Sequence, residues 1–211
     1  MKPGRRTPEI APELATGDLA LLLGGQRCED QRFTELDGAG RKLESLRARG
    51  CLMERCNLNE TTVKSVKLRD VRLVGCDLSN CVLLGCEATR VEFLRCRLTG
   101  LRATECRWES VLLEECEGRY AQFGGGVLTQ CEFRDGSWLE TDFTGAGLSR
   151  TVFTRVALRQ AEFTGARLTD SDLRGADLEG VRIRAEDVRG SIVTPAQALE
   201  WARLLGLRVS E

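Results

Sequence analysis

Ten cysteines stand out among the residues that could do chemistry, and nine of them share one spacing. They lie at multiples of five residues from one another: Cys51, Cys56, Cys76, Cys81, Cys86, Cys96, Cys106, Cys116 and Cys131. Such a series could form disulfides, hold a metal or serve redox chemistry. The chain has no His, and a straight column of thiols cannot surround an ion tetrahedrally. We therefore interpret the cysteines as small buried packing residues, and expect no metal and no cofactor.

The usual catalytic constellations are absent. The chain has a single Tyr, no GxSxG sequence and no complete Walker loop. The string GAGRKL at residues 38–43 lacks the full spacing of a phosphate loop and is read as a turn. We expect that the protein is not an enzyme.

Charge varies along the chain although the formal net charge is only -1. The segment from Glu105 to Asp142 contains nine acidic and three basic residues, a net charge of -6. The segment from Arg41 to Ser110 contains fourteen basic and nine acidic residues, a net charge of +5. An acidic stretch could imitate DNA phosphates toward a protein that binds DNA. The near-neutral total predicts no direct nucleic-acid contact. The acidic centre that could bind a partner comprises Glu114, Glu115, Glu117, Glu132, Asp135, Glu140 and Asp142.

These residues are positioned by a repeat of five. A large apolar residue recurs at most of the fifth positions from Phe33 to Ile183, with no insertion or deletion, and Gly38 and Ala48 are exceptions in the early repeats. A period of five fits neither an α-helix nor an alternating strand, and predicts a solenoid with sides five residues long. Glycine is frequent at the corner position. Gly118 is a gap among the large residues, which predicts room for a neighbouring Trp.

Phenylalanine spacing gives the number of sides. Phe33, Phe93, Phe133 and Phe153 differ by multiples of twenty, as do Phe123, Phe143 and Phe163. Four sides per coil would stack each set in an inner column, with the two columns on opposite sides. The segment from Gln31 to Gly190 then makes eight coils.

The segments CDLSN, ARLTD, SDLRG and GADLEG carry a resemblance to the pentapeptide-repeat protein family, of the MfpA and Qnr type. The resemblance implies an all-β fold, a right-handed quadrilateral β-helix of about eight coils with a C-terminal helical cap. Members of that type bind DNA gyrase by imitating duplex DNA. It therefore implies a binding protein that modulates or protects gyrase or another topoisomerase, in antibiotic or toxin self-resistance. This chain departs from that type in its near-neutral charge and its lack of loop insertions. The alternative is a generic protein-interaction scaffold with no topoisomerase role.

Three segments follow from the pattern: 1–27 as an N-terminal arm and cap, 28–190 as the β-helix, and 191–211 as a C-terminal helix. The stretch from Pro12 to Leu23 suits covering the open first coil, and an interaction arm is the alternative. In the last segment Thr194 is the predicted N-cap and Gly206 the stop. The helix either caps the rod or also pairs two subunits, and the resemblance favours a homodimer. The residues proposed for dimerisation are Leu199, Trp201, Leu204 and Leu205.

Because residues twenty apart stack on successive coils, the outward residues that share one face can be found by adding twenty to a residue number. One face carries Arg47, Arg49, Lys67, Arg69 and Arg107, and the face built around Phe93 and Phe133 is expected opposite to it. That second face mixes acids with a patch formed by Leu52, Val74, Leu94 and Leu112. The apolar patch is either a protein contact or the place where the N-terminal arm lies. Nothing in the chain has the length of a membrane span, and we expect a cytoplasmic protein.

Overall fold

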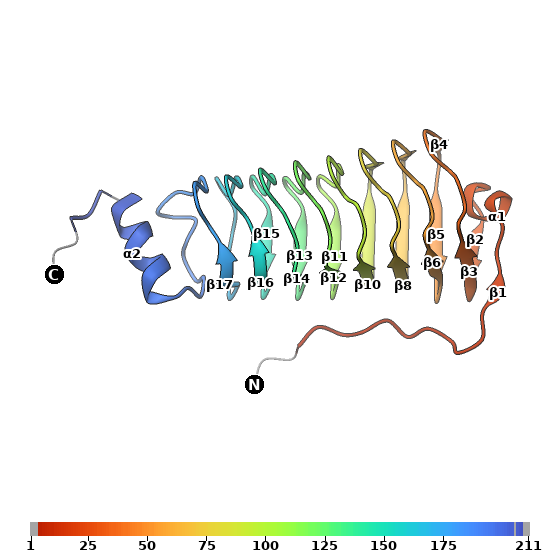
Figure 1. Cartoon of the computed structure of the whole chain (residues 1–211), viewed down its shortest axis with the longest axis horizontal. Coiled ribbons are helices and arrows are strands. Elements are labelled where there is room, and N and C mark those ends of the chain that lie inside the picture. Colours follow the sequence, from red (N-terminus) through yellow and green to blue (C-terminus); the bar gives the residue numbers. More distant parts are fainter. Residues whose placement is uncertain (1–3, 205, 209–211) are drawn as a thin grey trace.

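The computed structural model describes residues 4–204 and 206–208, and shows a four-sided parallel β-solenoid of about eight turns. Successive coils stack along one axis, with a short helix at each end (Figure 1). Residues twenty apart pair in register, as in Val71 with Val91 and Phe133 with Phe153. The predicted all-β solenoid is confirmed.

Two sides of the coil, which we call face 1 and face 2, carry most of the strands. Face 1 consists of β2 (Arg27–Glu29), β5 (Leu46–Arg49), β11 (Arg107–Glu109), β13 (Val127–Thr129) and β15 (Gly147–Ser149). Face 2 consists of β3 (Gln31–Thr34), β6 (Leu52–Glu54), β12 (Leu112–Glu114), β14 (Glu132–Arg134), β16 (Val152–Ala157) and β17 (Asp172–Asp177). β8 (Val66–Val74) and β10 (Cys86–Leu94) run through both faces. The two faces are therefore adjacent, and the expectation that they lie on opposite sides was wrong, because consecutive five-residue sides share a corner.

The other two sides have fewer regular strands. Face 3 follows face 2 and is held by isolated parallel bridges, from Asp37 with Asn57 to Ser137 with Ala157. Face 4 contains a three-stranded sheet of β4 (Lys42–Leu43), β7 (Thr62–Val63) and β9 (Val82–Leu83).

The chain turns most corners with one residue in the left-handed region. Gly125 has φ +65°, but nineteen non-glycine residues in the described part of the chain also adopt positive φ, among them Tyr120 and Glu115. A left-handed residue with a side chain carries a conformational cost. Main-chain hydrogen bonds to the next coil offset it, as in the 2.9 Å bond from the Glu115 amide to the Arg134 carbonyl. Corner glycine is thus favoured but not required.

The core contains the two predicted columns of phenylalanine. Phe133 stacks on Phe153 at 4.9 Å between ring centroids, and Phe143 stacks on Phe163 at 5.0 Å. The columns also meet edge to face, with Phe133 and Phe143 at 5.9 Å and 82°. Both geometries are favourable for aromatic rings, so the columns hold opposite sides of the coil together.

All ten cysteines are buried free thiols. Most of the sulfurs donate weak hydrogen bonds to the carbonyl twenty-three residues earlier, as in Cys81 to Leu58 and Cys116 to Phe93. Thr61 and Thr141 occupy the same inward position elsewhere and donate to the equivalent carbonyls. The inward position therefore accommodates a small side chain, and a thiol or hydroxyl there can donate one hydrogen bond.

Both ends of the solenoid are covered. At the first coil β1 (Ala15–Thr16) pairs with β3, and α1 (Leu19–Leu23) places Leu22 in the core. At the last coil lies α2 (Pro195–Leu204), whose Trp201 is only 7% exposed. Thr194 and Gln197 form a reciprocal capping box, since each main-chain amide is bonded by the other side chain. Gly206 follows the helix with φ +77°, as the predicted stop requires. Within the described residues, no helix has the length and apolar composition needed to cross a membrane.

Candidate functional site

An extended N-terminal arm, residues 4–14, occupies face 2. It leaves β1 and runs back beneath the solenoid toward its middle (Figure 1). Arg5 lies 3.0 Å from a carboxylate oxygen of Glu92 and 3.5 Å from one of Glu132. Further along the arm, the Glu9 amide donates to the Asp70 carboxylate at 3.0 Å. Face 2 thus binds an extended segment through one arginine and one main-chain amide.

Leu112 lies in register between the two carboxylates that hold Arg5. It pairs with Glu92 on one side and with Glu132 on the other. Its side chain points outward from the solenoid, yet it is only 4% exposed. Of the four residues in the predicted apolar patch, Leu112 is therefore buried, while Leu52, Val74 and Leu94 are half-buried.

Asp70 lies at the corner between faces 1 and 2 and binds the N-terminal arm. Its carboxylate accepts two hydrogen bonds from Arg90, both 2.5 Å long, besides the Glu9 amide. Burial alone would raise the pKa of this carboxyl, but these hydrogen bonds outweigh burial and hold its pKa below the usual value. Asp70 therefore stays charged while it holds the arm.

Arginines neutralise several carboxylates on face 2. Arg134 lies 2.8 Å from Glu114 and 2.9 Å from Glu132, and Arg72 lies 2.8 Å from Glu92. These partly exposed pairs contribute little to stability individually, but they fix where the carboxylate oxygens point. Face 2 is therefore an ordered array of alternating charges.

The structure brings together five of the seven residues of the predicted acidic centre. Glu114 and Glu132 lie on face 2, Glu115 and Asp135 at its corner with face 3, and Glu117 just beyond that corner on face 3. We call these five residues the acidic edge. Within the described part of the chain Glu115 and Glu117 are exposed and form no ion pair, whereas Asp135 pairs with Arg155 at 2.5 Å.

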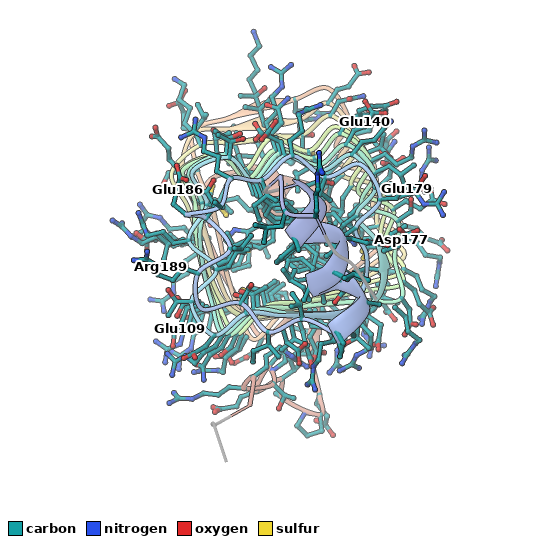
Figure 2. The ribbon with its side chains drawn as sticks, turned by 90° about the vertical axis from the view of Figure 1, so that its left-hand side faces the viewer. Glu109, Glu140, Asp177, Glu179, Glu186 and Arg189 are labelled. Atoms are coloured by element: carbon teal, nitrogen blue, oxygen red, sulfur yellow. The ribbon has the colours of Figure 1, made fainter. Side chains whose placement is uncertain are left out.

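The other two predicted acids lie elsewhere. Glu140 is at the corner between faces 3 and 4, and Asp142 is on face 4, paired in register with Glu162. In the view along the solenoid axis, Glu109 and Asp177 lie on opposite sides of a square section, with Glu140 near a separate corner (Figure 2). Acids close in sequence therefore point in different directions, because each five-residue side turns the chain.

The basic residues predicted on one face do lie together on face 1. Arg47 pairs in register with Arg27 and Lys67, and Arg49 pairs with Arg69. A shallow groove of about 490 Å³ lies over these side chains. Arg107 is separated from them by Glu87.

Two family models match the chain. One, described as a pentapeptide repeat region, matches residues 48–123, and another, described as pentapeptide repeats in eight copies, matches residues 141–184. The chain belongs to the pentapeptide-repeat family. The inward thiols, corner residues and face columns above are therefore features of this chain's own version of that repeat.

Among solved pentapeptide-repeat structures, the chain is similar to trypsin-treated QnrB1 variants, described as a plasmid-mediated fluoroquinolone resistance protein. For the R167E variant the identity is 22%, covering 93% of this chain and 95% of that one, with a TM-score of 0.41. For the M102R variant the identity is 24%, covering 92% of this chain and 95% of that one, with a TM-score of 0.36. HetL from the cyanobacterium Nostoc sp. strain PCC 7120, involved in regulating heterocyst differentiation, is 16% identical over 80% of this chain and 87% of that one, with a TM-score of 0.22. No protein with a curated description matches.

The residues proposed for dimerisation at the C-terminal helix of this pentapeptide-repeat chain differ in their exposure. Leu199 is 40% exposed, whereas Trp201 packs on the last coil. The side chain of Leu204 and the whole of Leu205 lie outside the described residues. Among the described residues, no cluster of three His, Cys, Asp or Glu side chains is arranged to hold a metal ion.

Sequence reasoning missed the two residues that fasten the arm. Arg5 lies outside the five-residue repeat, so no periodicity predicted its position. Asp70 occupies a corner position, and its burial depends on the arm and on Arg90. An acid at a corner followed by arginine twenty residues later was the only available signal.

Proposed function

We propose that this chain is a non-enzymatic binding protein whose carboxylates on face 2 and the acidic edge engage a protein surface that normally binds DNA phosphates. The family resemblance identified in the sequence makes DNA gyrase, or another type II topoisomerase, the partner to test. Binding there would inhibit the enzyme or protect it from an antibiotic or toxin. The ten unpaired thiols suit the reducing cytoplasm, where this partner is found.

The contact of Arg5 with Glu92 and Glu132 carries this proposal. It supports the idea that face 2 accepts a guanidinium between two carboxylates, with Leu112 beneath the arm. Arginine binds phosphate and carboxylate oxygens with the same planar donor geometry. A phosphate-binding arginine of the partner could therefore replace Arg5, and the unpaired Glu115 and Glu117 would add charge at the neighbouring corner.

A supercoiling assay tests the proposal. Purified chain is titrated into DNA gyrase with and without a gyrase poison, and we expect inhibition or protection at about micromolar concentration. Glu115→Lys with Glu117→Lys should remove the effect, because these exposed acids can change sign without breaking an ion pair. Glu60→Lys with Glu105→Lys is the matched control, since Glu60 and Glu105 are exposed corner residues with the same backbone conformation as Glu115. Equal activity of the two double variants would contradict mimicry at the acidic edge.

The second candidate is a protein-interaction scaffold that uses the rest of the apolar patch. Val74 and Leu94 pair in register on face 2 and remain half-buried while the arm is in place. Val74→Lys with Leu94→Lys should then abolish capture of the partner without changing the circular dichroism spectrum. If the same variant leaves partner binding intact, the patch is not the contact.

We also propose that the chain forms a homodimer through α2, supported by the exposure of Leu199. Leu199→Glu should convert the dimer to a monomer in sedimentation experiments, while Ala196→Glu, at an exposed position of the same helix, should not. A wild-type chain that is monomeric throughout the concentration range would contradict the proposal.

A further inference from the structure

Ion pairs between neighbouring coils follow a rule over most of the described surface. In nine pairs a cation lies beside an acid exactly one coil away, twenty residues along the chain. Arg55 with Glu35 and Lys64 with Glu44 are examples. Like charges directly opposite each other in a sheet are destabilising, so this pattern is the expected one.

Most cations in the first three coils of face 1 depart from this rule, although Lys67 follows it through its pair with Glu87. The outward positions of these coils carry Arg27, Glu29, Arg47, Arg49, Lys67 and Arg69, which are five cations and one acid. Arg47 is in register with a cation on each side, at the strand spacing of about 4.8 Å. Within the described residues neither Arg47 nor Arg49 has an ion pair, while Arg27 pairs with Glu29, Lys67 with Glu87, and Arg69 with Asp70 at 3.6 Å. We call Arg27, Arg47, Arg49, Lys67 and Arg69 the basic array.

We propose that the basic array binds the phosphate backbone of a nucleic-acid duplex. The five cations and one acid of these three coils carry a net charge of +4, about one positive charge for each 3.6 Å of solenoid axis, close to the spacing of about 3.4 Å between charges along one strand of a duplex. The stacked cations repel one another in the free protein, and a polyanion removes that repulsion. The ligand therefore supplies the negative charge that the neighbouring coils do not provide.

The composition of the array favours nucleic acid over an acidic protein. Every outward residue of these three coils on face 1 is charged, and none is apolar or aromatic. Protein interfaces have an apolar centre, which is missing here. Base stacking on aromatic side chains, used in binding single strands, is also missing, and this favours a duplex. Main-chain groups of β5 pair with β2 and β8 on either side, so no sheet edge is free to add a peptide strand.

The array borders the site of the arm, since Arg69 lies 3.6 Å from Asp70, but its five side chains are exposed and the arm does not cover them. The N-terminal arm is fastened to face 2, and the C-terminal helix covers the far end of the rod (Figure 1). Binding at face 1 therefore does not depend on displacing the arm, nor on the proposed contact with a topoisomerase.

Fluorescence anisotropy with a labelled duplex of random sequence and the full chain tests the proposal, with no topoisomerase present. We expect the logarithm of the association constant to fall linearly with the logarithm of the salt concentration, with a slope between about -3.6 and -4.5 for four or five phosphates. Arg47→Gln with Arg49→Gln should weaken binding at least about tenfold at low salt and make the slope shallower by about 2. Arg55→Gln with Lys64→Gln removes the same charge from paired positions elsewhere, and should leave both values nearly unchanged.

Thermal unfolding gives an independent readout. The Arg47→Gln and Arg49→Gln chain should melt at the same temperature as wild type or higher, because the substitutions remove repulsion and no ion pair. Lower stability, equal weakening by the control, or absence of duplex binding would overturn the proposal. So would tighter binding of a single strand, or of poly-glutamate, at the same salt concentration. The last result would assign the array to an acidic protein instead.

Discussion

Gly118 lies directly beside Trp138 in the inner column of face 3, one coil away. A Cβ atom at Gly118 would come within 2.1 Å of the Trp138 ring, which is fully buried. The prediction that this glycine makes room for a neighbouring Trp is confirmed. A Cβ atom at Gly136, two residues before Trp138, would come within 2.8 Å of the indole nitrogen. Two glycines therefore form the space that one indole fills.

Gly118→Ala should destabilise the chain by about 1 to 3 kcal/mol, because the added methyl group overpacks a core that cannot move locally. Chemical denaturation measures the loss. Gly124→Ala is the control, since its Cβ would meet only ordinary contacts at 3.5 Å or more, and it should change stability by less than about 0.5 kcal/mol. A smaller side chain at Trp138 in the Gly118→Ala background should recover part of the loss. Additive effects of the two substitutions would contradict the steric explanation.

The buried thiols should make the fold sensitive to alkaline pH. Burial raises the pKa of Cys81 and of Cys131 from 9.0 to about 12. The folded chain then holds these protons more tightly than the unfolded chain. The resulting stabilisation is complete below about pH 9 and is lost as pH rises toward 12. We expect the free energy of unfolding to fall by at least about 1 kcal/mol between pH 8 and pH 10.

Urea denaturation at several pH values measures this dependence. Cys81→Thr with Cys131→Thr should reduce the alkaline loss, because Thr occupies the same inward site at Thr61 and Thr141. The native thiols should also react with a disulfide reagent only after unfolding, since the thiolate is the nucleophile. Rapid native reaction of most thiols would contradict the assignment to packing.

Removing the Asp70 charge should release the arm. In Asp70→Asn the bidentate pair with Arg90 is lost and the hydrogen bond to the Glu9 amide weakens. Trypsin should then cleave after Arg5 and Arg6 several-fold faster than in wild type. Because the pKa of Asp70 is lowered on folding, its contribution is present above the usual carboxyl pKa of about 4 and is lost as pH falls below it.

Asp135→Asn is the control for this experiment. It also breaks an arginine pair, with Arg155, but Asp135 does not touch the arm. Its cleavage rate should match wild type. Equal acceleration in both variants would show general loosening and not release of the arm.

Gln197→Ala should loosen the C-terminal helix. The Gln197 side chain completes the capping box with Thr194 and donates to the main-chain carbonyls of Leu173 and Ala176, at 2.9 and 3.0 Å. Its loss should cost about 1 to 2 kcal/mol and increase hydrogen exchange in the last coil first. Glu200→Ala, at an exposed position of the same helix, should leave exchange unchanged. Unchanged exchange in the Gln197 variant would mean that Trp201 alone docks the helix.

The five-residue period predicted the fold well because the relevant interactions repeat locally. Each coil contacts only its neighbours, so an unbroken period fixes which residues stack, including the phenylalanine columns and the cations of face 1. The predicted arrangement of the faces was wrong at one point, because the basic face and the face of Phe93 are adjacent and share a corner. The near-neutral net charge predicted no nucleic-acid contact, and this stays a prediction that the duplex-binding experiment tests, because the total averages four faces with different charge patterns.

The sequence by itself determined the solenoid, its twenty-residue register and the membership of each surface column. Only the tertiary structure decided how the charges in those columns are used. It placed Arg5 between Glu92 and Glu132, divided the acidic centre among three faces, and left Arg47 and Arg49 without partners within the described chain. The physical reason is that coil stacking follows from the periodicity of the chain. The arm has no period, and an ion pair depends on where long side chains meet in space.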